Sequence, residues 1–162
     1  MIFHKKYQYG FTLIEVIVAL LVFASLFAIV TVNLLNVSHK ATLSESIDTF
    51  INNLKSQQLK AMVGDTEGSI TKENIGVYLA TDKYIDFYGS YNAQSSSNLE
   101  IKFDDNTKLI NTSFPSSRIL FISGSGEILG ATGNNTITLQ NTLSGEQKII
   151  TINKYGVVTS VN

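Results

Sequence analysis

The chain has 162 residues, no cysteine, one proline and a formal net charge of −1. This length allows one modest domain plus an anchor, and the lack of cysteine excludes a disulfide framework and a thiolate metal site. A charge so close to zero gives no bulk attraction to nucleic acid or to an acidic ligand.

The first third of the chain contains an apolar segment without a helix breaker. Residues 16–38 carry no formal charge, and about 20 such residues are enough to cross a bilayer as a helix. Lys5 and Lys6 precede the segment and favour a cytoplasmic N-terminus. We therefore expect a single-pass helix in contact with the lipid of the cytoplasmic (inner) membrane, with the rest of the chain outside the cytoplasm.

An ordinary export signal is an alternative interpretation, because Val22-Phe23-Ala24 offers a small-residue cleavage pattern. However, the apolar sequence continues to Val37, well past the point where the core of such a signal ends. Neither an export signal nor a plain anchor explains Glu15. A carboxylate within a membrane helix is costly, so it indicates a function and needs a partner.

The segment GFTLIEVIVALLVF, from Gly10 to Phe23, resembles the N-terminus of type IV prepilins and pseudopilins. The resemblance implies that a prepilin peptidase cuts between Gly10 and Phe11 and that the new Phe11 amine is N-methylated. It also implies that Glu15, four residues beyond Phe11, is the residue that docks subunits.

Cleavage would give Glu15 a partner, because the new α-amino group of Phe11 is mostly cationic at neutral pH. The carboxylate of an incoming subunit can pair with the amine of a neighbour already in the filament. Burying such a pair still carries a desolvation penalty, so the pairing contributes register more than stability.

The helix is expected to continue to residue 63, where Gly64 is a natural C-terminal stop. Apolar residues recur at helical spacing, with a slip at Gln57 and Gln58. We expect this apolar face to pack on the chain's own domain. It comprises Leu43, Ile47, Phe50, Ile51, Leu54, Leu59, Met62 and Val63.

From Asp65 onward, short runs of β-branched and aromatic residues alternate with turn residues. The expected strands cover residues 75–79, 84–88, 99–103, 118–123, 136–140, 148–153 and 156–161, with a weaker candidate at 108–111. The pattern predicts an α+β fold, in which a long N-terminal helix with a transmembrane half and an amphipathic half packs on a C-terminal antiparallel β-sandwich-like domain.

The expected domains follow from these elements. They are a prepilin leader peptide (1–10), a transmembrane or filament-core helix (11–37), an amphipathic extension (38–63) and a globular β domain (64–162).

The C-terminal half carries a second resemblance. ILFISGSGEILG and NTITLQNTLSGEQKIITINKYGVVTSV are similar to the GspH/FimT group of minor pilins and pseudopilins, which show an apolar strand, a turn ending in glycine, another strand pair and a last strand entered through a glycine.

The sequence indicates no enzyme, and we expect no catalytic residue, metal or cofactor. His4 and His39 have no neighbouring acid and nucleophile that would form a triad. Asp104, Asp105 and Asn106 could hold Ca²⁺ through oxygen ligands, but no glutamate completes a calcium loop, so a hairpin turn is the favoured interpretation.

Nucleic acid is not an expected partner. From Ser38 onward the chain has ten Lys/Arg against twelve Asp/Glu, whereas phosphate binding needs clustered cations. No basic tail follows Gly156, although Lys148 and Lys154 could form a small patch.

The sequence therefore predicts a minor pilin or pseudopilin, a structural subunit of a type IV pilus-like or type II secretion filament that could act in assembly initiation at the tip. Its expected partners are prepilin peptidase, other pilin or pseudopilin subunits and membrane lipid. Its globular domain would lie in the periplasm or at the cell exterior. The alternative is a membrane-anchored binding module of a competence pilus that recognises DNA or a surface, and a major pilin is a third possibility.

Overall fold

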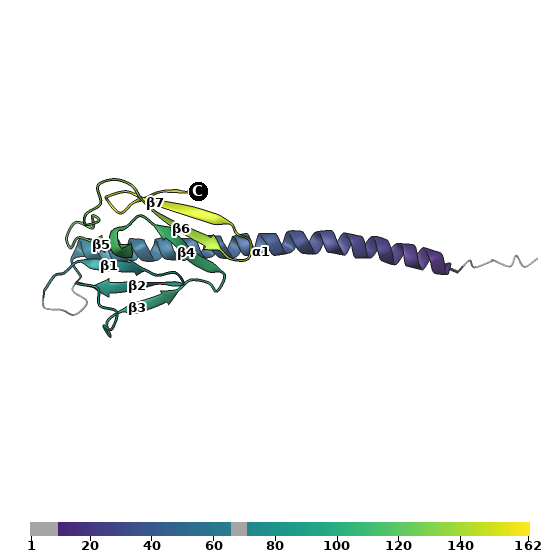
Figure 1. The fold of residues 1–162 in the computed structure, drawn as a ribbon, viewed down its shortest axis with the longest axis horizontal. Coiled ribbons are helices and arrows are strands. Elements are labelled where there is room, and N and C mark those ends of the chain that lie inside the picture. The colour runs from purple at the N-terminus through teal and green to yellow at the C-terminus, as the bar shows by residue number, and fades with distance from the viewer. Residues whose placement is uncertain (1–9, 66–70) are drawn as a thin grey trace, which may run out of the picture. The chain divides into compact units, whose positions relative to one another are not determined.

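The computed structural model describes residues 10–65 and 71–162, and for residues 29–41 it describes the backbone alone. The chain forms two compact units, Met1–Ser38 and His39–Asn162. A long helix, α1 (Leu13–Val63), contributes residues to both units. Two antiparallel sheets follow it, so the α+β class predicted from the sequence is confirmed (Figure 1).

The C-terminal end of α1 is closed by a glycine, as predicted. Gly64 has a positive φ of 68°, and its N–H donates to the carbonyl of Ala61 at 3.0 Å. The next N–H, of Asp65, donates to the carbonyl of Lys60 at 2.9 Å. This pair of bonds is the Schellman arrangement, which satisfies the last carbonyls of a helix and requires a left-handed residue where glycine stands.

Each sheet has four strands, and all neighbouring strands are antiparallel. The first sheet has the order β3-β2-β1-β5 and consists of β1 (Ile75–Leu79), β2 (Lys83–Tyr88), β3 (Leu99–Lys102) and β5 (Arg118–Phe121). The second has the order β4-β6-β7-β8 and consists of β4 (Thr107–Thr112), β6 (Asn135–Asn141), β7 (Gln147–Ile152) and β8 (Val158–Val161). A short 3₁₀ helix, η1 (Pro115–Ser117), precedes β5. All eight expected strands are present, including the weaker candidate at 108–111.

The connection at Asp104–Asn106 differs from the hairpin that the sequence suggested. It joins β3 of the first sheet to β4 of the second, and these two strands do not pair. Asp104 Oδ2 accepts the Asn106 N–H at 3.1 Å, and the Asp104 carbonyl accepts the Thr107 N–H at 2.8 Å. The three residues therefore form a turn, but its task is to carry the chain from one sheet to the other.

One hydrophobic core joins α1 to both sheets within the globular unit. Phe50 is fully buried at its centre, and its ring centroid lies 5.0 Å from that of Tyr84 and 6.0 Å from that of Phe103. The other buried apolar residues of this core include Leu43, Ile47 and Leu54 on α1, Ile75, Val77, Leu79, Ile119 and Phe121 on the first sheet, and Ile137, Leu139, Ile150 and Ile152 on the second.

Near its C-terminal end, the buried face of α1 differs from the predicted apolar face. Leu59, Met62 and Val63 are exposed, by 61%, 50% and 68%, whereas Gln57 and Ala61 are buried. The reason is geometric, because the buried positions step by three or four residues from Leu43 onward, and that spacing brings residues 57 and 61 to the sheet. The helical spacing of buried positions therefore continues through residue 57 without a break, and Gln57 is a polar residue in a core position.

Candidate functional site

The first turn of α1 holds the residues that the sequence singled out. Thr12 immediately precedes the helix, and Glu15 is its third residue. Glu15 Oε2 accepts hydrogen bonds from both the backbone N–H and the hydroxyl of Thr12, each at 3.0 Å. In return, the Glu15 N–H donates to Thr12 Oγ1 at 3.3 Å.

This reciprocal pair is a capping box, in which a Ser or Thr at the N-cap and a Glu or Gln three residues later satisfy free N–H groups of the first turn. A carboxylate there also interacts favourably with the positive end of the helix dipole. Glu15 therefore has a role within its own chain that the sequence analysis missed. The local signal for this role is Thr12-Leu13-Ile14-Glu15, which has the Ser/Thr-x-x-Glu spacing of a capping box.

The Gly10–Phe11 bond lies just before the capped turn and outside the helix. A Cβ atom built at Gly10 would meet no atom within 4 Å, and Phe11 is 87% exposed. Among the residues that the structure describes, none covers the expected cleavage bond. The leader residues 1–9, with His4, Lys5 and Lys6, lie outside the described residues, as does the side chain of His39.

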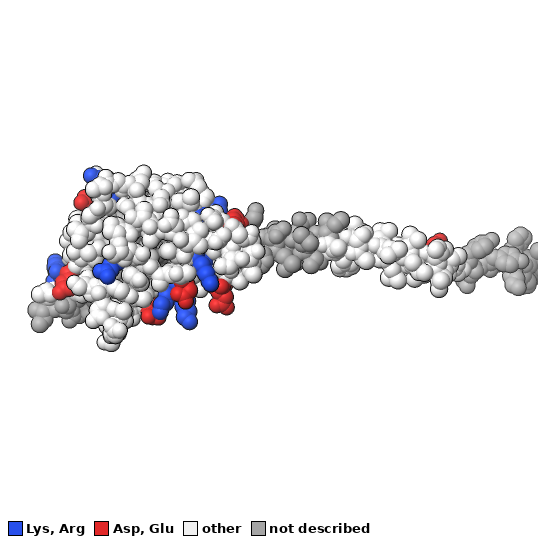
Figure 2. Space-filling view, in the orientation of Figure 1, with Lys and Arg blue, Asp and Glu red and all other residues white. Residues whose placement is uncertain are grey.

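The surface of α1 beyond Phe11 is apolar and uncovered. Every described side chain from Phe11 to Ala28 is exposed, and Glu15 is the charged residue among them. In the view of Figure 2 this stretch is almost free of charge, in contrast to the globular unit. A continuous apolar surface of this kind marks a site of contact with lipid or with other protein chains.

The expected transmembrane segment, residues 11–37, is described only in part, because the side chains of residues 29–37 are outside the description. Within the described residues, no helical stretch is both long enough and apolar enough to cross a membrane.

The candidate calcium and nucleic-acid sites gain no support. The described residues contain no group of three or more His, Cys, Asp or Glu side chains placed to hold a metal ion. Lys148 lies near the start of β7, and Lys154 lies in the turn after the strand ends at Ile152, so the two do not stand side by side on the strand. Lys154 Nζ lies instead over the Tyr155 ring, 4.8 Å from its centroid. The charged side chains in Figure 2 are of mixed sign over the globular unit.

Comparison with known proteins finds a family match at the N-terminal end of the chain, which includes Gly10, Phe11 and Glu15. Residues 5–31 match the family model described as the prokaryotic N-terminal methylation motif. The match does not reach the residues that resemble the GspH/FimT group. No curated protein and no solved structure matches the chain. The chain thus carries the N-terminal signal of type IV pilin-like proteins, a signal that implies cleavage by prepilin peptidase, membrane anchoring and assembly with other pilin subunits.

Proposed function

We propose that this protein is a minor pilin or pseudopilin of the GspH/FimT type, a structural subunit of a type IV pilus-like or type II secretion filament. In this proposal residues 1–10 are a leader, and the peptidase cuts between Gly10 and Phe11. Residues 11–37 form the membrane or filament-core helix, 38–63 the amphipathic extension and 64–162 the globular domain.

The observation that carries the proposal is the methylation motif at residues 5–31, combined with the bare apolar surface that follows it. Exposed apolar side chains from Phe11 to Phe27 are costly in water, so lipid before assembly and neighbouring helices after assembly would cover them. Glu15 interrupts this surface at one point. A charge at a defined position on an otherwise apolar helix can set the register between subunits.

The globular unit supports the role of a subunit by its architecture. Its core is built jointly by α1 and the two sheets, so a chain of this kind can display a β domain on a helix that belongs to the filament. The resemblance to the GspH/FimT group covers the segment from β5 to β8, and the position of this protein at the tip is inferred from that resemblance alone.

Processing is the direct test. The full chain is co-expressed with a prepilin peptidase, and the intact mass of the product is measured. We expect a chain that begins at Phe11 and carries one additional methyl group. Gly10→Leu is the matched variant, because it changes the residue before the bond and leaves the helix unchanged, and we expect it to stay uncut. A product that begins at Ser25, or an uncut native chain, contradicts the proposal.

A further inference from the structure

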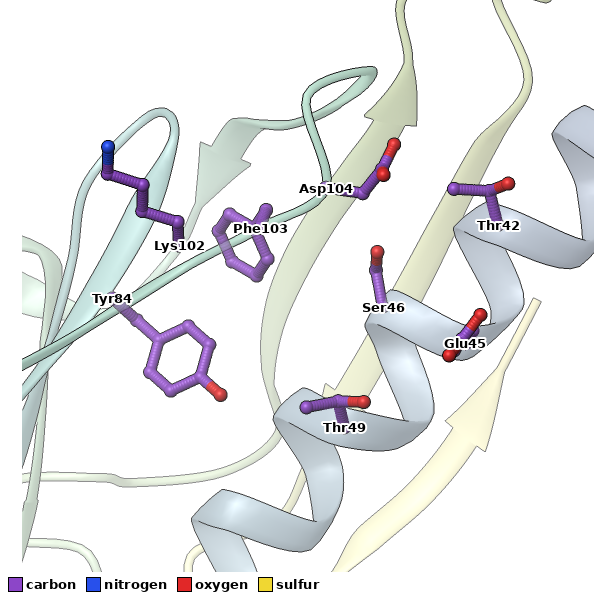
Figure 3. A pocket seen from close by; sticks show the side chains of 8 residues that line it. All are labelled: Thr42, Glu45, Ser46, Thr49, Tyr84, Lys102, Phe103 and Asp104. Carbon is purple, nitrogen blue, oxygen red and sulfur yellow. The ribbon is translucent and has the colours of Figure 1, made fainter.

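A pocket of about 220 Å³ opens between α1 and the end of β3 within the globular unit (Figure 3). One wall is the polar side of α1, and the opposite wall comes from β2 and the segment after β3. The groups that matter below are the carboxylates of Glu45 and Asp104, the hydroxyls of Ser46 and Thr49, and the rings of Tyr84 and Phe103.

The hydroxyl of Tyr84 points to a ligand for this pocket. Tyr84 is only 2% exposed, and in Figure 3 its hydroxyl is directed toward α1 near Thr49. No residue in the described ranges forms a hydrogen bond with this hydroxyl. The enclosed side-chain atoms without a partner in the described residues all belong to residues other than Tyr84, so the Tyr84 hydroxyl is not sealed from solvent. It can therefore exchange water for a polar group that enters the pocket from outside.

The shape of the pocket limits what can enter. Its volume of about 220 Å³ is below the roughly 300–1,000 Å³ of small-molecule sites. Tyr84 and Phe103 are 2% and 7% exposed, so neither ring offers an open face on which a sugar or a base could stack. The pocket therefore suits the end of a protein side chain.

The charge of the pocket limits the occupant further. Glu45 and Asp104 are both exposed carboxylates at its rim, while the ammonium group of Lys102 points away from the pocket in Figure 3. Two carboxylates from different segments attract a cation. A divalent metal would need more oxygen ligands, because Ca²⁺ takes about 6–8 of them, and the described residues provide no group of three acidic or histidine side chains.

We propose that this pocket binds the guanidinium group of an arginine side chain from a neighbouring subunit. Guanidinium is planar, always charged and carries about five N–H donors, which matches a site made of carboxylates and hydroxyl acceptors. An ammonium group has fewer donors and no planar fork, so it pairs less well with carboxylates on two sides. The chemistry of the site rests on the pocket itself, whereas the identity of the donor as a filament subunit rests on the proposed function.

A peptide titration tests the site without any filament. The full chain in detergent micelles is labelled with ¹⁵N, and acetyl-Gly-Arg-Gly-amide is added. We expect saturable shifts of the backbone amides of Ser46, Thr49 and Asp104. The peptide with citrulline in place of arginine has the same shape without the charge, and we expect about ten-fold weaker binding, the change given by the loss of one charge-assisted hydrogen bond.

Three variants locate the binding. Tyr84→Phe keeps the buried ring and removes the hydroxyl, and Asp104→Asn removes one rim charge. Each should weaken binding of the arginine peptide about five- to ten-fold, as expected for the loss of one polar partner. Asp105→Asn is the matched control, because Asp105 is exposed and adjacent but does not line the pocket. We expect it to change binding less than two-fold.

Several results would overturn the inference. They are equal binding of the citrulline peptide, unchanged binding by both Tyr84→Phe and Asp104→Asn, shifts that do not saturate, or saturation by Ca²⁺ but not by the arginine peptide. Failure of these tests leaves the processing at Gly10 untouched. Conversely, a bound peptide in a chain that the peptidase does not cut supports the pocket and contradicts the filament role.

Discussion

Thr12 donates two hydrogen bonds to one carboxylate oxygen of Glu15, the first from its backbone N–H and the second from its hydroxyl. The carboxylate that we propose for docking is therefore already engaged within its own chain. The two uses have different requirements. A capping box accepts either Glu or Gln at this position, whereas pairing with a neighbour's amine requires a negative charge. If Gly10–Phe11 is cut, Thr12 becomes the second residue of the mature chain and the box can persist.

The buried face of α1 should carry much of the stability of the globular unit. We expect His39–Asn162, produced without residues 1–38, to fold as a mostly β domain. Phe50→Ala and Leu54→Ala should each lower its free energy of unfolding by about 2–5 kcal/mol, because both side chains are buried in the core. Leu59→Ala, at an exposed position, should change it by less than about 0.5 kcal/mol. Urea denaturation of the three variants measures this, and a change for Phe50 as small as that for Leu59 would contradict the described packing.

Gln57 should resist replacement by an apolar residue although it lies on the core face. Its Nε2 donates to Asp86 Oδ2 at 2.7 Å, and Asn53 Nδ2 donates to the same oxygen at 2.8 Å. Gln57→Leu removes a donor from a buried carboxylate, so we expect a loss of about 1–3 kcal/mol in the free energy of unfolding.

The matched control for this change is Leu59→Gln, the reverse exchange two residues along the same helix. It should be nearly neutral, because position 59 is exposed. Denaturant midpoints of the two variants decide the question. A stabilised Gln57→Leu protein would show that the Asp86 contact contributes nothing.

These two positions also show where sequence reasoning succeeds and where it ends. The C-terminal end of α1 and all eight strands follow from local signals, namely periodicity, a terminal glycine and turn residues. Gln57 was not recognised as a core residue because its partner, Asp86, lies on β2 and only the fold brings them together. Gly76 is similar, since a Cβ atom there would lie 2.2 Å from the Phe87 ring on the paired strand. The sequence shows only a glycine inside a strand.

The proposed arginine pocket could not be predicted from the sequence either, because its residues come from segments that only the fold brings together. It joins Ser46 and Thr49 to Tyr84 and Asp104, and no short-range pattern links these segments. In the sequence, Asp104 stands beside Asp105 and Asn106, and this local pattern indicates only a turn or a calcium loop. The change of sheet between β3 and β4 is what places Asp104 beside α1.

The alkaline limit of stability should depend on Tyr84. Burial, followed by the negative charge of Asp86, raises the pKa of its phenol to about 12, against about 10 in an unfolded chain. Between about pH 10 and 12 the folded state therefore keeps this proton while the unfolded state loses it. The contribution of Tyr84 to the free energy of unfolding is thus fully present below about pH 10 and is lost as the pH rises toward 12. The loss is on the order of 1–3 kcal/mol.

Tyr84→Phe isolates this effect, because it removes the titrating group and keeps the ring that packs on Phe50. Urea midpoints are measured from pH 9 to 11.5 for the native chain and the variant. We expect the native midpoint to fall more steeply than that of the variant, since all other titrating groups are shared. Parallel curves would mean that the phenol has the same pKa in both states.

The last prediction separates the two roles of Glu15. Glu15→Gln keeps a side chain that fits the capping box and removes the charge. Thr12→Val keeps the β-branched shape and the Glu15 charge but removes the hydroxyl that joins the box. Both variants should still be cut, because the resemblance to prepilins places peptidase recognition mainly at Gly10. If docking is electrostatic, Glu15→Gln should lose incorporation beside other subunits, since a neighbour's amine would be buried without its counter-charge, and Thr12→Val should retain most of it.

The measurement is crosslinking to neighbouring subunits in membranes, scored on the cleaved form alone so that processing and docking are not confused. Glu15→Ala removes both the charge and the box, and it sets the level expected for complete loss. The ranking of the variants carries the answer. Strong crosslinking by Glu15→Gln with weak crosslinking by Thr12→Val would show that Glu15 acts by holding the first turn of its own helix, and the intermolecular pair with Phe11 would then be ruled out for this chain.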